Sequence, residues 1–277
     1  MRKATIGALL AGATAIGLAP IFVRLSETGS TATAFWRVTL ALPFLLAWSR
    51  RSPSDKFDWQ MLWPGIFFAG DLAVWHVAIL WTSVANATLL ANAAPIFVAL
   101  VAWLWLGERL RWTFFAGLVV ALCGAGLVMR ASFAMSTRHF RGDFLGVATA
   151  LFYASYQLSV KRLRTIHTTG AIMFWSTLVS AVVLLPVALG FGEQMMPSTM
   201  RGWGVLLALA VISHVGGQGL IAWALAHGPA SAASVSLLWQ PVVATFVAWL
   251  VFGERLSGSH AIGASIVLVG IYLAWRR

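Results

Sequence analysis

Few charged or titratable side chains fall inside the long apolar stretches of this sequence, and these are the residues whose chemistry stands out. Arg37 and Asp71 lie at similar depths in two successive stretches, and His76 lies five residues beyond Asp71. A charge at the centre of a bilayer costs about 2.5–3.5 kcal/mol, so each is a candidate functional group. We hypothesise that Arg37 pairs with Asp71, or that Arg37 instead binds the carboxylate of a substrate through two hydrogen bonds. A purely structural Arg37, reaching to the membrane surface or joining two helices, is the alternative.

Neutral polar and aromatic residues recur inside the same stretches. Tyr153 and Gln157 are four residues apart and therefore share a helix face, as do His214 and Gln218. Aromatic walls with a few hydrogen-bonding groups are typical of a small-molecule pocket, although hydrogen bonds between helices would explain each residue equally well. The candidate substrate-binding residues are Arg37, Asp71, Trp75, His76, Asn92, Tyr153, Gln157, His214, Gln218, Trp239 and Gln240.

Motifs for other kinds of chemistry are absent from the sequence. It contains no Walker A motif, which excludes a nucleotide-driven motor. It also contains no nucleophile elbow, spaced carboxylate pair or cluster of metal ligands, so we expect no enzyme activity, no cofactor and no metal. Asp71, His76 and His214 are the embedded groups able to carry a proton. Proton-coupled and uncoupled transport therefore both stay open.

The elements that position these residues are long apolar helices. Apolar residues make up 60% of the 277 residues and charged residues only 10%, against about 25% in soluble domains. A helix of about 20 apolar residues crosses a hydrocarbon core. Ten membrane-spanning helices are predicted, over residues 4–24, 31–49, 61–81, 84–106, 112–130, 143–160, 169–190, 202–226, 230–252 and 260–275.

The distribution of positive charge indicates orientation rather than a nucleic-acid partner. The net charge is +11, but nearly all Lys and Arg residues lie in loops or at helix ends. They are denser on the side of the amino terminus, as at 50–51 and 161–164, than on the opposite side. This bias places both termini in the cytoplasm.

The chain contains two copies of one unit. Residues 95–124 and 241–270 share Pro, Gly-Glu-Arg-Leu (GERL), Gly and Gly, and each residue of this pattern recurs 146 positions later. Upstream, Phe35-Trp36 returns as Phe174-Trp175. Internal repetition of this kind predicts two structural units of the same fold.

The repetition divides the chain into residues 1–134 and 135–277. Each unit contains five predicted spans, an odd number, so the second unit must enter the membrane upside down. The expected fold is an all-α integral membrane protein with ten transmembrane helices, arranged as two inverted five-helix repeats around a central cavity. Inverted repeats are typical of secondary transporters, whose substrate site lies near the bilayer midplane. A duplicated membrane scaffold without transport is the alternative.

Two prolines near the middle of predicted spans indicate breaks beside the cavity. Pro95 and Pro241 each remove one backbone hydrogen bond and free the carbonyl groups of Ala91 and Leu237. A break within the membrane is tolerated only against protein or a wet cavity, whereas simple kinking is the structural alternative. The predicted hinge residues are Pro95, Pro241, Gly216 and Gly217.

The glycines of the repeat have a structural interpretation. Gly117 and Gly124 lie seven residues apart and share a helix face, as do Gly263 and Gly270. Small residues let membrane helices approach closely, so these four predict packing. The glutamate of each GERL turn follows a glycine that ends a helix, and we expect it to form a cap and loop ion pair.

The repeated Pro, GERL, Gly and Gly residues resemble the two EamA-type repeats of the drug/metabolite transporter superfamily. Within it the chain is most similar to the ten-helix bacterial amino-acid exporters of the YddG type. The resemblance implies that helices 1–4 and 6–9 surround the cavity and that helices 5 and 10 are peripheral. It also implies export of aromatic or other apolar amino acids across the bacterial inner membrane. The first helix has no acidic residue, so the resemblance does not extend to the small multidrug members.

We therefore expect a secondary transporter that exports small metabolites, above all amino acids, by alternating access. A broad-specificity exporter of drugs or xenobiotics with the same fold is the alternative. The expected partners are a small-molecule substrate and the lipid bilayer, with no nucleic acid, and the expected carrier is a monomer.

Overall fold

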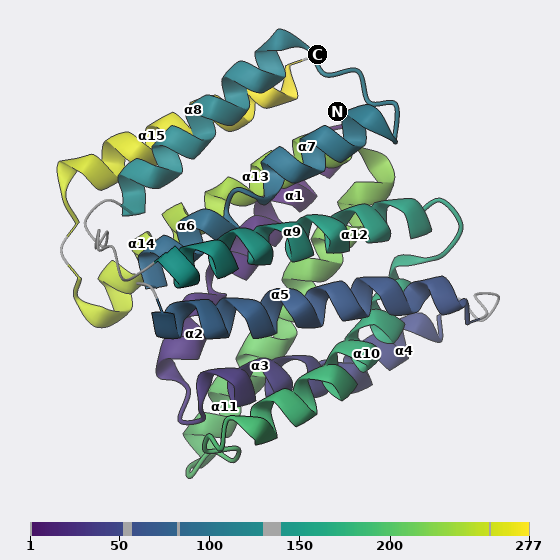
Figure 1. Ribbon diagram of the computed structural model, residues 1–277, viewed down its shortest axis with the longest axis vertical. Helices are drawn as coiled ribbons and strands as arrows, with labels where there is room; N and C mark the ends of the chain where they lie inside the picture. The colour runs from purple at the N-terminus through teal and green to yellow at the C-terminus, as the bar shows by residue number, and fades with distance from the viewer. Residues whose placement is uncertain (1, 52–56, 82–83, 130–139, 255, 277) are drawn as a thin grey trace.

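The computed structural model describes residues 2–51, 57–81, 84–129, 140–254 and 256–276, and these residues form helices and loops without a strand (Figure 1). The elements are α1 (Lys3–Gly17), α2 (Ala19–Leu25), α3 (Ser30–Thr39), α4 (Leu42–Ser49), η1 (Trp59–Met61), α5 (Leu62–Trp81), α6 (Val84–Ala91), α7 (Ala94–Leu104), α8 (Trp112–Met129), α9 (Phe140–Leu163), α10 (Thr169–Gly190), α11 (Met200–Ala208), η4 (Leu209–Gln218), α12 (Gly219–His227), α13 (Ala230–Ser236), η5 (Leu237–Trp239), α14 (Gln240–Phe252) and α15 (Gly258–Trp275). The chain is thus all-helical.

Several helical stretches are long and apolar enough to cross a membrane. The structure describes seven of them: Lys3–Leu25, Ser30–Ser49, Trp112–Met129, Thr169–Gly190, Met200–His227, Ala230–Phe252 and Gly258–Trp275. The other predicted spans coincide with α5, with α9 and with α6 followed by α7. The protein is therefore a multi-pass membrane protein, and the count of ten crossings stays a prediction.

The two predicted interruptions are present. α6 ends at Ala91 and α7 begins at Ala94, with Pro95 in its first turn. In the second half, the 3₁₀ turn η5 separates α13 from α14, and Pro241 lies in the first turn of α14. Proline lacks an N–H and is tolerated in the first turn of a helix but not in its interior, which explains why a new helix begins one residue before each proline.

Two further interruptions were not predicted. The first two spans are each divided, at Leu18 and at Leu40-Ala41, just before Pro20 and Pro43. Pro186, by contrast, lies inside α10 without dividing it. The hydrophobic pattern alone does not distinguish these cases, because all three prolines lie in apolar runs of similar length.

The region of the predicted hinge Gly216 and Gly217 forms a π-helix, η4. Its hydrogen bonds run from residue i to i+5, and such helices are rare beyond a single turn and frequent at functional sites.

α8 and α15 pack side by side along one edge of the bundle, at the top of Figure 1. A Cβ atom added to Gly117 would lie 2.6 Å from the carbonyl oxygen of Gly270, and one added to Gly124 would lie 2.8 Å from that of Gly263. Only a hydrogen atom fits in such a space. The predicted packing role of these glycines is confirmed.

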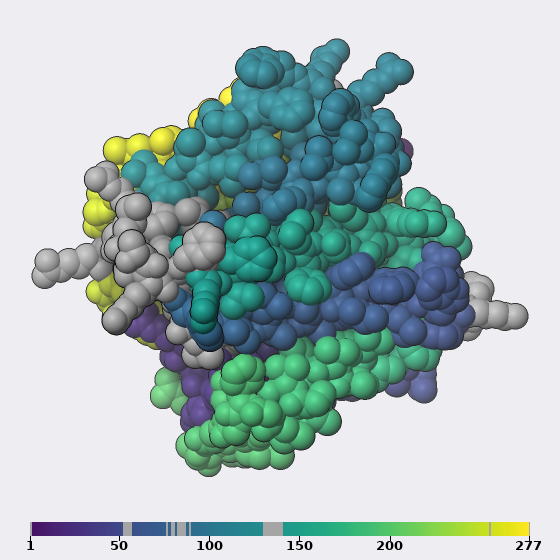
Figure 2. All heavy atoms as spheres, in the orientation of Figure 1, coloured from purple at the N-terminus to yellow at the C-terminus, as the bar shows by residue number. Residues whose placement is uncertain are grey.

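The remaining helices form the body of the bundle. α1 packs against η4 and α12, α9 packs against α5, and α10 packs against α3, α4 and α5. On the face shown in Figure 2, side chains of α5, α9 and α10 fill the gaps between the ribbons. Large apolar side chains on the outside, such as Trp105 and Trp112, are suited to lipid.

The two GERL turns follow α7 and α14. Gly107 and Gly253 have φ angles of 66° and 67°, which glycine adopts without steric cost. The carboxylate of Glu108 accepts hydrogen bonds from the N–H groups of Ala230 (2.6 Å) and Ser231 (3.3 Å), the first residues of α13. The prediction of a cap with a loop ion pair is confirmed only for the cap, since no ion pair joins Glu108 to another described side chain, and this cap joins the two halves of the chain.

The glutamate of the second turn has a different partner. Glu254 forms an ion pair with Arg24 at the end of α2, and both side chains are about half exposed. An exposed pair of this kind contributes at most about 1 kcal/mol. Arg255, the arginine of this turn, lies outside the described residues.

Candidate substrate cavity

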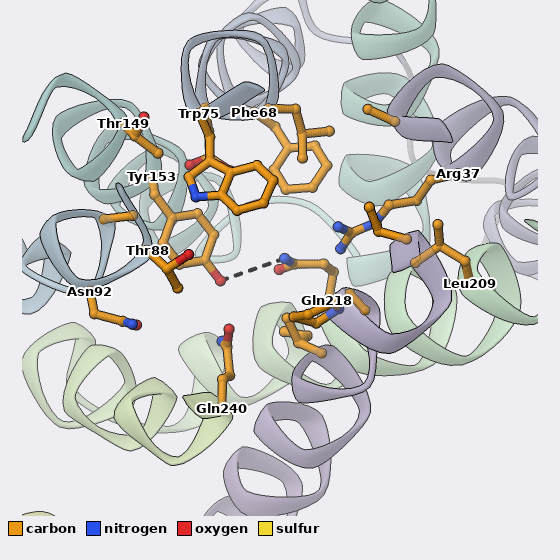
Figure 3. A pocket seen from close by; sticks show the side chains of 18 residues that line it. Arg37, Phe68, Trp75, Thr88, Asn92, Thr149, Tyr153, Leu209, Gln218 and Gln240 are labelled. Carbon is orange, nitrogen blue, oxygen red and sulfur yellow. Dashed lines mark hydrogen bonds between the residues drawn. The ribbon is translucent and has the colours of Figure 1, made fainter. Parts of the chain in front are cut away.

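A cavity of about 180 Å³ lies among α1, α2, α3, α5, α9 and the broken helices of both halves. Its walls include more than half of the predicted site residues, which come from distant parts of the chain (Figure 3). These residues are Arg37, Asp71, Trp75, Asn92, Tyr153, Gln218 and Gln240. The sequence therefore predicted the main polar groups of the cavity.

Arg37 is the positive group of the cavity. It lies in the last turn of α3, directly before the interruption at Leu40-Ala41, where the partial negative charge of a helix end favours a cation. The residue is only 8% exposed, and its Nε and Nη2 atoms have no hydrogen-bond partner among the described residues. Its Cζ atom lies 5.6 Å from the centre of the Phe68 ring. The guanidinium group thus keeps unused donors.

Asp71, from the middle of α5, is the negative group of the same cavity. No ion pair within 4.0 Å joins the described side chains of Arg37 and Asp71, so the predicted pairing is not formed in this structure. The two groups line one cavity without a direct contact, so each can reach an opposite charge on a ligand. This arrangement agrees with the second hypothesis for Arg37.

Four neutral polar side chains lie beside these charges. The Nε2 atom of Gln218 donates to the hydroxyl oxygen of Tyr153 over 3.5 Å, while its Oε1 atom has no described partner. In Figure 3 the side chain of Gln240 extends toward the same space from the start of α14. Asn92 enters from the turn between α6 and α7. Both helix interruptions thus border the cavity, as predicted.

Three of the other candidate residues do not line the cavity. Gln157 is fully buried one helical turn from Tyr153, and neither of its amide atoms has a described partner. His214 shares a hydrogen bond of 2.8 Å with the hydroxyl group of Thr177 on α10. Trp239 donates to the Thr14 hydroxyl group over 3.1 Å. The side chain of His76 lies outside the described residues.

The cavity wall also contains residues that the sequence analysis missed. Phe68 forms part of the aromatic wall beside Arg37, and Thr88 and Thr149 add hydroxyl groups. A signal for both threonines existed, because Thr88 precedes Asn92 by four residues and Thr149 precedes Tyr153 by four residues. Thr149 also donates to the carbonyl oxygen of Leu145 over 3.0 Å, which leaves its lone pairs for another partner.

The chemistry of this wall is that of binding. It combines one cation, one anion, neutral amides and hydroxyl groups, and aromatic rings. No group of three or more His, Cys, Asp or Glu residues that could hold a metal ion occurs within the described ranges. A small molecule with both charges and an apolar part matches this set of groups.

Comparison with known proteins identifies the family. A model of the EamA-like transporter family matches residues 3–130 and, separately, residues 140–276. The chain belongs to the EamA-like transporter family. The resemblance inferred from the GERL repeats is thereby confirmed, and the protein is a membrane-embedded transporter of small molecules rather than an enzyme.

Several relatives in this family have named cargo. The chain is 29% identical to the pseudopaline exporter CntI of Pseudomonas aeruginosa, over 76% of this chain and 72% of that protein. It is 27% identical to a probable terminal-alkyne amino-acid exporter of Streptantibioticus cattleyicolor, over 76% and 71%. It is 24% identical to a riboflavin transporter of Vibrio cholerae, over 84% and 77%.

A solved crystal structure has the same fold. It superposes with a TM-score of 0.84 at 18% identity and covers 99% of this chain and 98% of the other. At this identity the likeness concerns the fold alone.

Proposed function

We propose that this protein exports small amino-acid-type metabolites across the bacterial inner membrane by alternating access, as a monomeric secondary transporter. The observation that carries the proposal is the cavity in which Arg37 and Asp71 lie unpaired beside neutral polar groups. Relatives named as exporters of pseudopaline and of a terminal-alkyne amino acid support the direction and the class of cargo.

In this proposal, the two charged groups of the cavity bind the charged groups of the substrate. The guanidinium of Arg37 binds the carboxylate of the substrate, and the carboxylate of Asp71 receives its ammonium group. Tyr153, Gln218 and Gln240 bind the remaining polar atoms. Phe68 and Trp75 hold an apolar side chain, since aromatic rings provide a large contact area at low entropic cost.

We further propose that residues 1–134 and 135–277 are inverted repeats with ten crossings in total. The packing supports this relation, because equivalent helices of the two halves make equivalent contacts. α1 packs against η4 and α12, and its counterpart α9 packs against α5, the counterpart of that stretch. α8 packs against its own counterpart, α15. With the positive-inside bias, both termini lie in the cytoplasm.

The interruptions and the π-helix are the proposed moving parts. Pro95 and Pro241 begin the second half of their helices beside the cavity, and Gly216 and Gly217 lie in η4. Segments with missing or displaced backbone hydrogen bonds change their bend at low cost. Rocking of one bundle against the other about these points would expose the cavity to each side in turn.

Counterflow in proteoliposomes tests the function. Liposomes containing the purified protein and an unlabelled amino acid should take up the same labelled amino acid faster than empty liposomes. An aromatic or aliphatic amino acid should compete, and its amide or ester, which lacks the carboxylate, should not. Equal transport of aromatic compounds without a carboxylate would favour the broad drug exporter. Absence of counterflow for every amino acid would contradict the proposal.

A further inference from the structure

A second cleft, distant from the cavity, lies where α8 begins, α13 begins and α15 ends. Its volume is about 590 Å³, and none of its lining residues also lines the substrate cavity. Three arginines line it, Arg109, Arg111 and Arg276, and so do the apolar side chains of Phe114 and Trp275. The cleft therefore combines concentrated positive charge with an apolar wall.

Glu108, the one acidic side chain among the described residues of this cleft, does not neutralise the three arginines. Glu108 is engaged by the N–H groups of Ala230 and Ser231 and by the Ser231 hydroxyl group. Arg276 donates from Nε and Nη2 to the hydroxyl oxygen of Tyr272, over 3.1 and 2.9 Å, which fixes its side chain without cancelling its charge. The cleft thus presents an unbalanced positive potential to any ligand.

The depth of the cleft is fixed by the helices that form it. α8 begins at Trp112 and α15 ends at Trp275, and both helices are among the apolar stretches that can cross a membrane. The residues at their ends therefore lie at the boundary between hydrocarbon and water. Tryptophan is enriched at that depth, and Trp112 is 81% exposed. The three arginines lie where lipid headgroups lie.

We propose that this cleft binds the headgroup of an anionic phospholipid. The phosphate contacts the guanidinium groups of Arg109, Arg111 and Arg276, and the first part of an acyl chain lies along Phe114 and Trp275. Basic pockets between transmembrane helices bind anionic headgroups in this way, and guanidinium groups form paired hydrogen bonds with phosphate oxygens. A soluble phosphate would gain nothing from the apolar wall. The site is separate from transport and does not depend on the proposed substrate.

Lipid retention by the whole protein tests the site. The protein is reconstituted into phosphatidylcholine vesicles containing phosphatidylglycerol, extracted into detergent, and the retained lipids are counted by native mass spectrometry. The wild type should retain phosphatidylglycerol in preference to phosphatidylcholine. Arg109→Gln, Arg111→Gln and Arg276→Gln should each reduce that preference roughly fivefold, since one arginine near the surface contributes this much. Arg50→Gln, Arg51→Gln and Arg162→Gln, which change exposed arginines elsewhere, should leave the preference unchanged.

Two further measurements separate a lipid site from a folding defect and from a site for soluble phosphate. Arg→Lys at the three cleft positions keeps the charge, so these variants should still prefer phosphatidylglycerol, and the preference should weaken as salt is added. This test stays valid even if a Gln variant is poorly folded. Glycerol 3-phosphate added during extraction should not displace the retained lipid. Equal retention of both lipids by the wild type, an undiminished preference in folded triple Gln protein, or full displacement by glycerol 3-phosphate would overturn the proposal.

Discussion

The guanidinium group of Arg37 is buried and forms no direct ion pair with Asp71, so its charge can bind a substrate. A buried guanidinium with unused donors is costly unless a ligand completes its hydrogen bonds. We expect Arg37→Gln to raise the substrate concentration needed for half-maximal counterflow about 10- to 100-fold, the loss typical of a charge-assisted bond. Arg37→Lys keeps the charge but loses the paired hydrogen bonds. Its substrate concentration for half-maximal counterflow should lie between those of the wild type and Arg37→Gln. An unchanged apparent affinity in Arg37→Lys would remove Arg37 from the substrate site.

Two buried glutamines form a matched pair that distinguishes binding from packing. Gln218 lines the cavity, whereas Gln157 is fully buried away from it with an unpartnered amide. Gln218→Leu should weaken apparent affinity roughly three- to tenfold. Gln157→Leu should leave affinity unchanged and keep or raise the unfolding temperature, because it removes a buried amide without partners. If Gln157→Leu weakened transport as much as Gln218→Leu, the assignment of the cavity wall would be wrong.

The sequence predicted which polar residues line the cavity better than it predicted the contacts between them. Arg37, Asp71 and Tyr153 were found because polar residues are rare and costly inside apolar runs. Their relation was not predictable, because a difference of a few ångströms decides whether Arg37 meets Asp71. The partner of His214 was also not predictable, because Thr177 lies 37 residues upstream on another helix.

At the scale of the elements, the contact between α8 and α15 depends on glycine. A Cβ atom on Gly270 would lie 2.7 Å from the Cα atom of Ala121, so Gly270→Ala must push the two helices apart. We expect it to destabilise the protein by about 1–3 kcal/mol, as overpacking does. Gly126→Ala, in the same helix pair but with nothing within 4 Å of its Cβ position, should be neutral or slightly stabilising. Thermal unfolding in detergent measures both. Equal stability of the two variants would contradict the packing account.

The loops before α3 and α11 hold each other through carboxylates. Glu193 accepts from the N–H groups of Thr31 (2.9 Å) and Ala32 (3.2 Å), and Glu27 accepts from those of Ser198 (2.8 Å) and Thr199 (3.0 Å). These bonds connect the loop between α2 and α3 to the loop between α10 and α11. They fasten one end of the first half to the second half.

The loop contact of Glu27 predicts a pH dependence. The Thr199 hydroxyl group, with the N–H groups of Thr199 and Ser198, holds the pKa of the Glu27 carboxyl below its ordinary value of 4.5. A carboxylate with a lowered folded-state pKa stabilises the fold above its unfolded pKa, and this stability is lost as the pH falls through the folded pKa. Wild type should therefore unfold at a higher temperature than Glu27→Gln at neutral pH. The difference should shrink below about pH 4.5, and a difference independent of pH would contradict this role.

The sequence predicted the type of the elements more fully than their interruptions. Apolar runs indicated helices, and Pro95 and Pro241 indicated breaks that are present. Pro20 and Pro43 also divide helices, whereas Pro186 does not. The local sequence around these prolines does not separate the two outcomes, because all of them lie in apolar runs. The capping partner of Glu108 was likewise hidden, because it lies more than 100 residues away.

At the scale of the whole molecule, the account depends on the relation between the halves. The family match covers residues 3–130 and 140–276 with the same family, and equivalent helices pack in equivalent ways. Two upside-down copies can exchange their conformations, so a cavity closed on one side can open there when its counterpart closes.

The sidedness of the two GERL turns tests this relation most directly. Cys123 is replaced by serine, and one cysteine is introduced at an exposed position, as Arg109→Cys or Leu256→Cys. Intact cells are treated with a membrane-impermeant maleimide before and after permeabilisation. The account predicts that Leu256→Cys reacts in intact cells and that Arg109→Cys reacts only after permeabilisation. Reaction of both cysteines from the same side would contradict the inverted arrangement and the alternating access built on it.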